Sequence, residues 1–89
     1  MKYSILITPK AKKSLRRLPP EIVERFYLLT RVLEEKGPTG PYMMRNYSKL
    51  SATEYHCHLT YSCVACWRHE GRNLVVEVYY VGSRESAPY

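Results

Sequence analysis

Hydrophobic and polar positions at the start of the chain predict a strand that leads into a helix. Tyr3, Ile5 and Ile7 are apolar at every second position, and a period of two residues is typical of a half-buried strand. Thr8 and Pro9 follow directly. Threonine is a favoured N-cap residue and proline a favoured first helical residue, so we expect a helix to begin there.

The next segment predicts two helices separated by a proline pair. Ala11, Leu15 and Leu18 recur at helical spacing, and Pro19-Pro20 ends this helix and opens another. Gly37-Pro38 is a typical helix end. The apolar face of the second helix consists of Ile22, Val23, Phe26, Leu29 and Leu33. We therefore expect a helical hairpin with an apolar inner face.

Strand patterns dominate the rest of the chain, after a loop at residues 37–41. We expect strands over residues 43–50, 54–61, 63–69 and 73–81, with a tight hairpin turn at 70–73. So little chain separates the second and third of these strands that residues 54–69 form either one bent strand or two strands with a bulge. The order predicts one α+β domain over residues 1–89: an N-terminal strand, a two-helix hairpin, and a three- to four-stranded antiparallel sheet.

Charge favours a polyanionic partner. The 89 residues carry 14 Lys and Arg against 8 Asp and Glu, a formal charge of +6, which suits nucleic acid or an acidic protein segment. Five of these cations lie in the first predicted helix: Lys10, Lys12, Lys13, Arg16 and Arg17. We expect them to contact nucleic-acid phosphates. The alternative is a solvated outer face.

Other features narrow the class of protein. No apolar stretch approaches 18 residues and no basic-then-apolar leader is present, so we expect a soluble, cytoplasmic protein that does not bind a membrane. Three cysteines cannot all pair, which favours a reducing compartment. Cys63 and Cys66 have zinc-ligand spacing, but residues three apart in a strand face opposite sides. We therefore expect core cysteines and no metal site.

Two histidines are the first candidates for chemistry. A period of two places His56 and His58 on one face of their strand, away from the apolar face that meets the helices. Histidine is the side chain best suited to move protons near neutral pH. The alternative is a surface pair without a role. Glu77, the one charge in the last strand, is a candidate neighbour across the sheet.

The last strand leads directly into Arg84 and Tyr89. Arginine can hold a phosphate bidentately, and tyrosine can stack on a base or exchange a proton, although Tyr89 could also be a frayed terminal aromatic. RNA cleavage by transphosphorylation needs a base, an acid and cations for the phosphorane, and here requires neither metal nor cofactor. The candidate catalytic residues are His56, His58, Arg84, Tyr89 and Lys49, with Arg45 as a further RNA-binding cation.

The order of these features resembles the RelE/ParE superfamily of bacterial toxin–antitoxin systems over nearly the whole chain. No single motif is specific to this superfamily; the order and spacing of the motifs along the chain carry the resemblance. The matching segments are Thr8-Pro9-Lys10-Ala11, Leu18-Pro19-Pro20, Gly37-Pro38, Lys49-Leu50, Tyr55-His56-Cys57-His58-Leu59 and Tyr79-Tyr80-Val81-Gly82.

The resemblance to the RelE branch implies a ribosome-dependent mRNA endonuclease toxin. By position, His56 replaces an arginine that follows the tyrosine of the third strand, and Lys49 resembles a basic residue before that strand. Arg84 and Tyr89 resemble the arginine after the last strand and the terminal tyrosine. The implied partners are an acidic or amphipathic antitoxin, the ribosome and mRNA. A homodimer and a monomer are both compatible with the sequence. The rival interpretations are a ParE-like, non-enzymatic topoisomerase inhibitor and an inactive module that binds nucleic acid or a partner.

Overall fold

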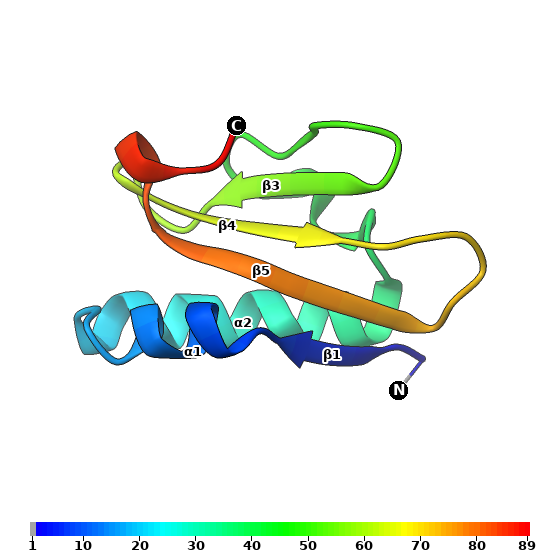
Figure 1. The fold of residues 1–89 in the computed structure, drawn as a ribbon, viewed down its shortest axis with the longest axis horizontal. Coiled ribbons are helices and arrows are strands. Elements are labelled where there is room, and N and C mark those ends of the chain that lie inside the picture. Colours follow the sequence, from blue (N-terminus) through cyan, green and yellow to red (C-terminus); the bar gives the residue numbers. More distant parts are fainter. Residues whose placement is uncertain (1) are drawn as a thin grey trace.

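Two helices and a five-stranded sheet form the domain in a computed structural model that describes residues 2–89 (Figure 1). The helices are α1 (Pro9–Leu15) and α2 (Pro20–Lys36), followed by a short 3₁₀ helix, η1 (Gly40–Met43). The strands are β1 (Ser4–Ile7), β2 (Ser48–Lys49), β3 (Glu54–His58), β4 (Cys63–Arg68) and β5 (Val75–Ser83). A last 3₁₀ turn, η2 (Arg84–Ser86), follows β5. The predicted α+β class is confirmed.

The sheet is mixed, with strand order β1-β5-β4-β3-β2. β1 runs parallel to β5, with Ile5 opposite Val76, and the other neighbouring strands are antiparallel. The N-terminal strand thus extends the predicted antiparallel sheet along the outer side of β5. The strand expected over residues 43–50 is reduced to Ser48–Lys49. The reason is local: η1 occupies the start of that segment, and Asn46 takes a positive φ of 52° that interrupts extended backbone.

Two hairpins connect the last three strands. Residues 54–69 form two strands joined by a tight turn, in which the Leu59 N–H donates to the Cys63 carbonyl at 2.8 Å. Gly71, with φ +60°, lies in the predicted turn between β4 and β5. A bulge lies in that pair, because Cys66 faces Tyr80 while Trp67 faces Val78.

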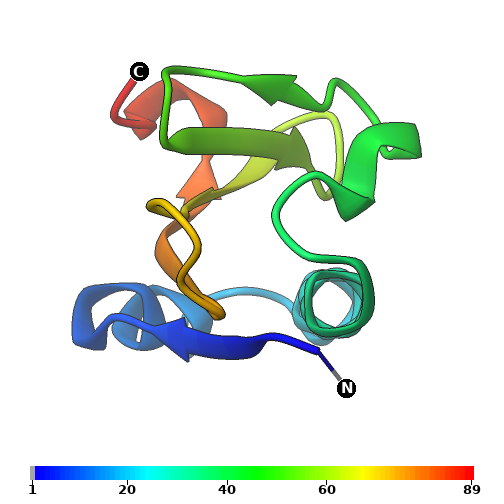
Figure 2. The ribbon, with the colours of Figure 1, turned by 90° about the vertical axis from the view of Figure 1, so that its right-hand side faces the viewer.

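The helix ends follow the sequence prediction. Thr8 caps α1, its hydroxyl accepting the Ala11 N–H at 3.2 Å, and Gly37 ends α2 with φ +82°. The expected helical hairpin, however, is open. α1 is short, packs mainly against β5 rather than α2, and ends before Leu18 (Figure 2).

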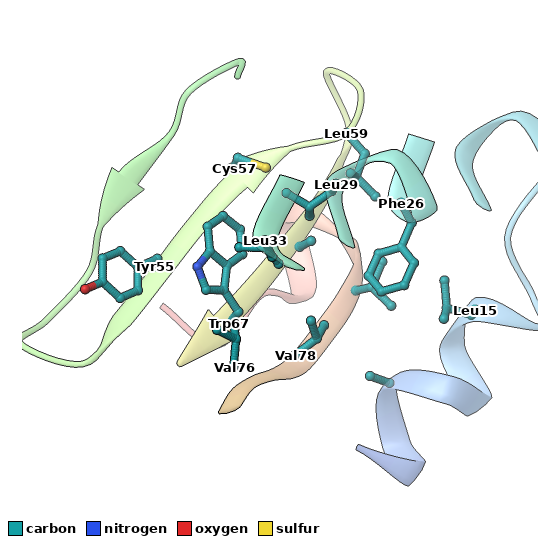
Figure 3. Packing of buried hydrophobic residues seen from close by; sticks show 13 residues of the cluster. Leu15, Phe26, Leu29, Leu33, Tyr55, Cys57, Leu59, Trp67, Val76 and Val78 are labelled. Carbon is teal, nitrogen blue, oxygen red and sulfur yellow. The ribbon is translucent and has the colours of Figure 1, made fainter. Parts of the chain in front are cut away.

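The core lies between α2 and one face of the sheet (Figure 3). Phe26, Leu29 and Leu33 of α2 are fully buried against Trp67 and Val78. The Trp67 indole N–H donates to the Pro38 carbonyl at 2.9 Å, which ties β4 to the loop after α2.

All three cysteines are free and buried, as expected of core residues. Cys57 belongs to the core cluster on the helix side of the sheet. Burial raises the pKa of Cys57 and of Cys66 to about 12. Both thiols therefore stay protonated at neutral pH and are poor nucleophiles.

The glycine at the end of α2 yields a stability prediction. A Cβ added to Gly37 would lie 2.6 Å from Cζ of Tyr3, and its φ of +82° is strained for any L-residue. We expect Gly37→Ala to lower the free energy of unfolding by at least about 2 kcal/mol in urea titrations. Gly71→Ala is the matched control, since its φ is +60° with nothing within 4 Å of the added Cβ. It should cost about 1 kcal/mol. Equal losses would contradict the steric role of Tyr3.

Candidate functional site

β3 presents two different faces. Tyr55 and Cys57 point into the core, whereas His56 and His58 lie on the opposite face with ring centroids 5.6 Å apart. The shared face predicted for the histidines is therefore present. Both are buried, in contrast to the surface pair that was the alternative: only 8% and 7% of their surfaces are accessible.

The histidines are covered by segments that the strand pattern does not reveal. Ser48 of β2 lies opposite His56 in register, and the His58 N–H donates to the Arg45 carbonyl at 2.8 Å. The Tyr89 ring closes over His56, with centroids 4.6 Å apart. Tyr89 thus packs on His56, in place of the frayed end that was the alternative.

These side chains line a hollow of about 560 Å³ on the face of the sheet away from the core. It holds four of the five predicted catalytic residues together with three residues that were not predicted. The lining residues are Asn46, Tyr47, Ser48, His56, His58, Arg84 and Tyr89.

His56 is held in its neutral form. Burial lowers the pKa of His56 below its ordinary 6.5, the neighbouring His58 lowers it further, and a hydrogen bond with the Ser48 backbone opposes both effects. The Ser48 hydroxyl also lies 3.0 Å from Nδ1 of His56, which fixes the ring orientation. Among the described residues, Nδ1 of His58 is buried without a hydrogen-bond partner. The neutral imidazole of His56 can accept a proton from a ligand.

Tyr89 is held in its protonated form. Partial burial and the Cys66 thiol raise the pKa of Tyr89 above its ordinary 10, and the Arg84 cation opposes them. The residue is still 56% exposed and is therefore accessible to a ligand. His56 and Tyr89 therefore have pKa values displaced in opposite directions within one hollow, the arrangement expected of a base paired with an acid.

Arg84 is positioned by its backbone and by an aromatic ring. Its N–H donates to the Ser62 carbonyl at 2.9 Å, and its guanidinium lies 4.6 Å from the ring centre of Tyr61. The Tyr80 hydroxyl donates to the Ser83 carbonyl at 2.6 Å. These two hydrogen bonds hold the turn from β5 into η2, and that turn orients Arg84.

Three predicted residues lie outside the hollow. Lys49 is opposite Tyr55 and therefore faces the core side, with Nζ 5.7 Å from the tyrosine ring centre. Arg45 contributes its carbonyl to β3, but its side chain does not line the site. The proposed contact of Glu77 with the histidines is wrong, because Glu77 pairs with Nε of Arg68 at 3.1 Å.

The basic cluster of the first helix also lies elsewhere. Lys10, Lys12, Lys13, Arg16 and Arg17 are all exposed. They belong to the β1 end of the sheet, whereas the C-terminus lies at the β3 end (Figures 1 and 2). Lys12 and Arg16 border a groove with Val23 and Tyr27. The contact of these cations with nucleic-acid phosphates remains a prediction.

Ser48 is the most important residue that sequence reasoning missed. Its role depends on the register between β2 and β3. β2 has only two residues, too few for its sequence pattern to predict that register. Asn46 offered a weak signal, since asparagine tolerates the left-handed backbone that turns the chain into the site. Within residues 2–89, no group of three or more His, Cys, Asp or Glu side chains is arranged to hold a metal ion. No helix in the same range has the length and apolar character needed to cross a bilayer.

Because His56 is buried, its replacement should lower the stability of the fold. Loss of a buried ring and of the hydrogen bond to Ser48 is expected to cost about 1–3 kcal/mol, so His56→Ala should lower the thermal midpoint. Tyr89→Phe keeps the ring and loses only an exposed hydroxyl, so its midpoint should stay near that of the wild type. Calorimetry of both variants checks this, and a His56→Ala midpoint equal to the wild type would show that the histidine is not packed.

Comparison with solved structures identifies the fold. The archaeal RelE–RelB complex from Pyrococcus horikoshii OT3 contains a chain 19% identical to this one, with a TM-score of 0.76, covering 98% of this chain and 100% of that chain. A free-state variant of the E. coli toxin RelE is 22% identical, with a TM-score of 0.74 and coverage of 98% and 88%. A YoeB/ParE toxin from Agrobacterium tumefaciens is 16% identical, with a TM-score of 0.72 and coverage of 91% and 98%. No protein-family model and no curated protein matches the chain. The chain therefore has the fold of the RelE and YoeB toxins.

Proposed function

We propose that this protein is the toxin of a toxin–antitoxin pair and cleaves mRNA on the ribosome by metal-independent acid–base chemistry. The observation that carries the proposal is the contact between His56 and Tyr89, whose pKa values are displaced in opposite directions, beside the cation of Arg84. A purely binding surface has no need for such a pair. The fold shared with the RelE and YoeB proteins supports the role of a toxin.

The chemistry follows from the protonation states. Neutral His56 removes the proton of a ribose 2′-hydroxyl, whose oxygen attacks the adjacent phosphorus. As the bond from phosphorus to the 5′-oxygen breaks, Tyr89 donates its proton to that oxygen. The products are a 2′,3′-cyclic phosphate and a 5′-hydroxyl. Arg84 balances the negative charge that develops on the phosphorane oxygens.

The proposed antitoxin would bind the helical side of the molecule. Tyr27 and Leu28 of α2 are exposed large apolar residues, and Lys12 and Arg16 border the groove beside Tyr27. An amphipathic segment with acidic side chains complements both properties. The structural neighbours include the RelE–RelB and YoeB–YefM complexes.

A second candidate function is inhibition of a topoisomerase without cleavage, which the fold shared with a YoeB/ParE toxin favours. The two candidates differ in what stops first in a cell that expresses the protein. Pulse labelling should show translation falling before DNA synthesis. The reverse order would favour the topoisomerase.

Removal of one hydroxyl should separate chemistry from binding. We expect Tyr89→Phe to slow mRNA cleavage in ribosome complexes by ~10²–10⁴-fold, the usual contribution of a positioned acid. Primer extension on a translated message measures the cleavage rate. Tyr42→Phe is the matched control, because Tyr42 is exposed on η1 and lies outside the hollow. Full activity of Tyr89→Phe would exclude Tyr89 as the acid.

The pH dependence of the cleavage rate should reveal the protonation of the proposed base, His56. Because the pKa of His56 is lowered from 6.5, the imidazole is already neutral at pH 7, and cleavage should be insensitive to pH from about 7 to 9. The rate should fall only at acidic pH, as His56 takes up a proton, with a midpoint below 6.5. Single-turnover cleavage across this range measures the profile. In His56→Ala the residual rate should lose this acidic decline, and its persistence there would assign the base to another group.

A further inference from the structure

A second hollow adjoins the candidate active site and shares Arg84 with it. It has a volume of about 280 Å³ and lies between the turn after β3 and the end of β5. Its lining residues are Tyr61, Ser62, Cys63, Ser83, Arg84 and Glu85. Of these, Arg84 alone also lines the histidine hollow. A ligand held by Arg84 in one hollow can therefore extend into the other.

We propose that this second hollow binds the base of the nucleotide next to the cleaved phosphate and selects bases with an exocyclic amino group. The proposal rests on the nuclease function and adds a specificity site to it. Three features carry it: an exposed aromatic ring, an arginine guanidinium over that ring, and a glutamate that lines the same hollow.

Tyr61 and Arg84 form a stacking platform. Tyr61 is 69% exposed, and the Arg84 guanidinium lies 4.6 Å from its ring centre. Bases stack on tyrosine rings and on guanidinium planes, and neither requires a particular base. A guanidinium that stacks through its face keeps the N–H groups of its edge free for a phosphate. Arg84 can thus serve a base and its phosphate together.

The walls of this hollow are held by hydrogen bonds before any ligand arrives. The Arg84 N–H donates to Ser62, and the Cys63 N–H donates to the Thr60 hydroxyl at 3.2 Å. On the other wall, the Glu85 N–H donates to the Ser83 hydroxyl at 3.0 Å. A preformed site loses less conformational entropy on binding than one that must be ordered.

Glu85 supplies the selectivity. An ionised carboxylate only accepts hydrogen bonds, so it favours an amino group such as N4 of cytosine. Uracil places a carbonyl oxygen at the same position, which repels the carboxylate and leaves both groups without a donor. Cytosine and uracil have the same size and stacking area, so discrimination between them isolates the contribution of Glu85.

Titration with mononucleotides tests this site without requiring cleavage. We expect cytidine 3′-monophosphate to bind about fivefold or more tightly than uridine 3′-monophosphate, with NMR shift changes centred on residues 61–63 and 83–85. Glu85→Gln should bring the two affinities together, because an amide can donate as well as accept. Tyr61→Ala should weaken both nucleotides by about five- to a hundredfold, the range measured for base stacking, while Tyr61→Phe keeps wild-type affinity.

Tyr42→Ala controls for the removal of an exposed tyrosine elsewhere and should change neither affinity. Equal binding of the two nucleotides by the wild type, or an unchanged preference in Glu85→Gln, would overturn the proposed selectivity. Absence of shift changes at residues 61–63 and 83–85 would overturn the site itself. Each result is independent of the cleavage assays, so a loss of this subsite and a loss of the nuclease function are told apart.

Discussion

The placement of Trp67 is the constraint on which the rest of the structure depends. The ring is fully buried in the middle strand of the sheet, stacks with Tyr55 at a centroid distance of 6.2 Å, and donates its N–H to the carbonyl of Pro38. One side chain thus joins β4, β3 and the loop after α2. Because Tyr55 must face Trp67, His56 must face the other way. The chemistry on the outer face is a consequence of how the inner face packs.

The candidate site gains its properties from partial enclosure rather than from unusual residues. Burial disfavours the cation of His56 and also disfavours the anion of Tyr89, so one physical effect moves the two pKa values apart. Arg84 opposes the effect on Tyr89 without abolishing it. Enclosure by Ser48 and Tyr89 depends in turn on a two-residue edge strand and on the turn that follows β5.

The sequence predicts those features that depend on local chemistry. Thr8-Pro9 and Gly37 mark helix ends through capping and backbone freedom, and alternation places His56 and His58 on one face. Features set by pairing between distant strands were not predictable. The parallel position of β1 beside β5, the choice of Ser48 over Lys49 at the site, and the partner of Glu77 all depend on register. Alternation within one strand carries no information about its neighbour.

The position of β5 between β1 and β4 links the assembly of the site to the order of folding. β1 bonds only to β5, and β5 lies between β1 and β4 although it is the last strand in the chain. Contacts between segments so far apart in sequence form late and slowly. Until residues 75–83 are in place, the apolar face of α2 lacks the cover of Val76 and Val78, and Arg84 has no strand end to follow. A partly folded chain therefore carries no assembled candidate site, and the site forms only when the last strand completes the sheet.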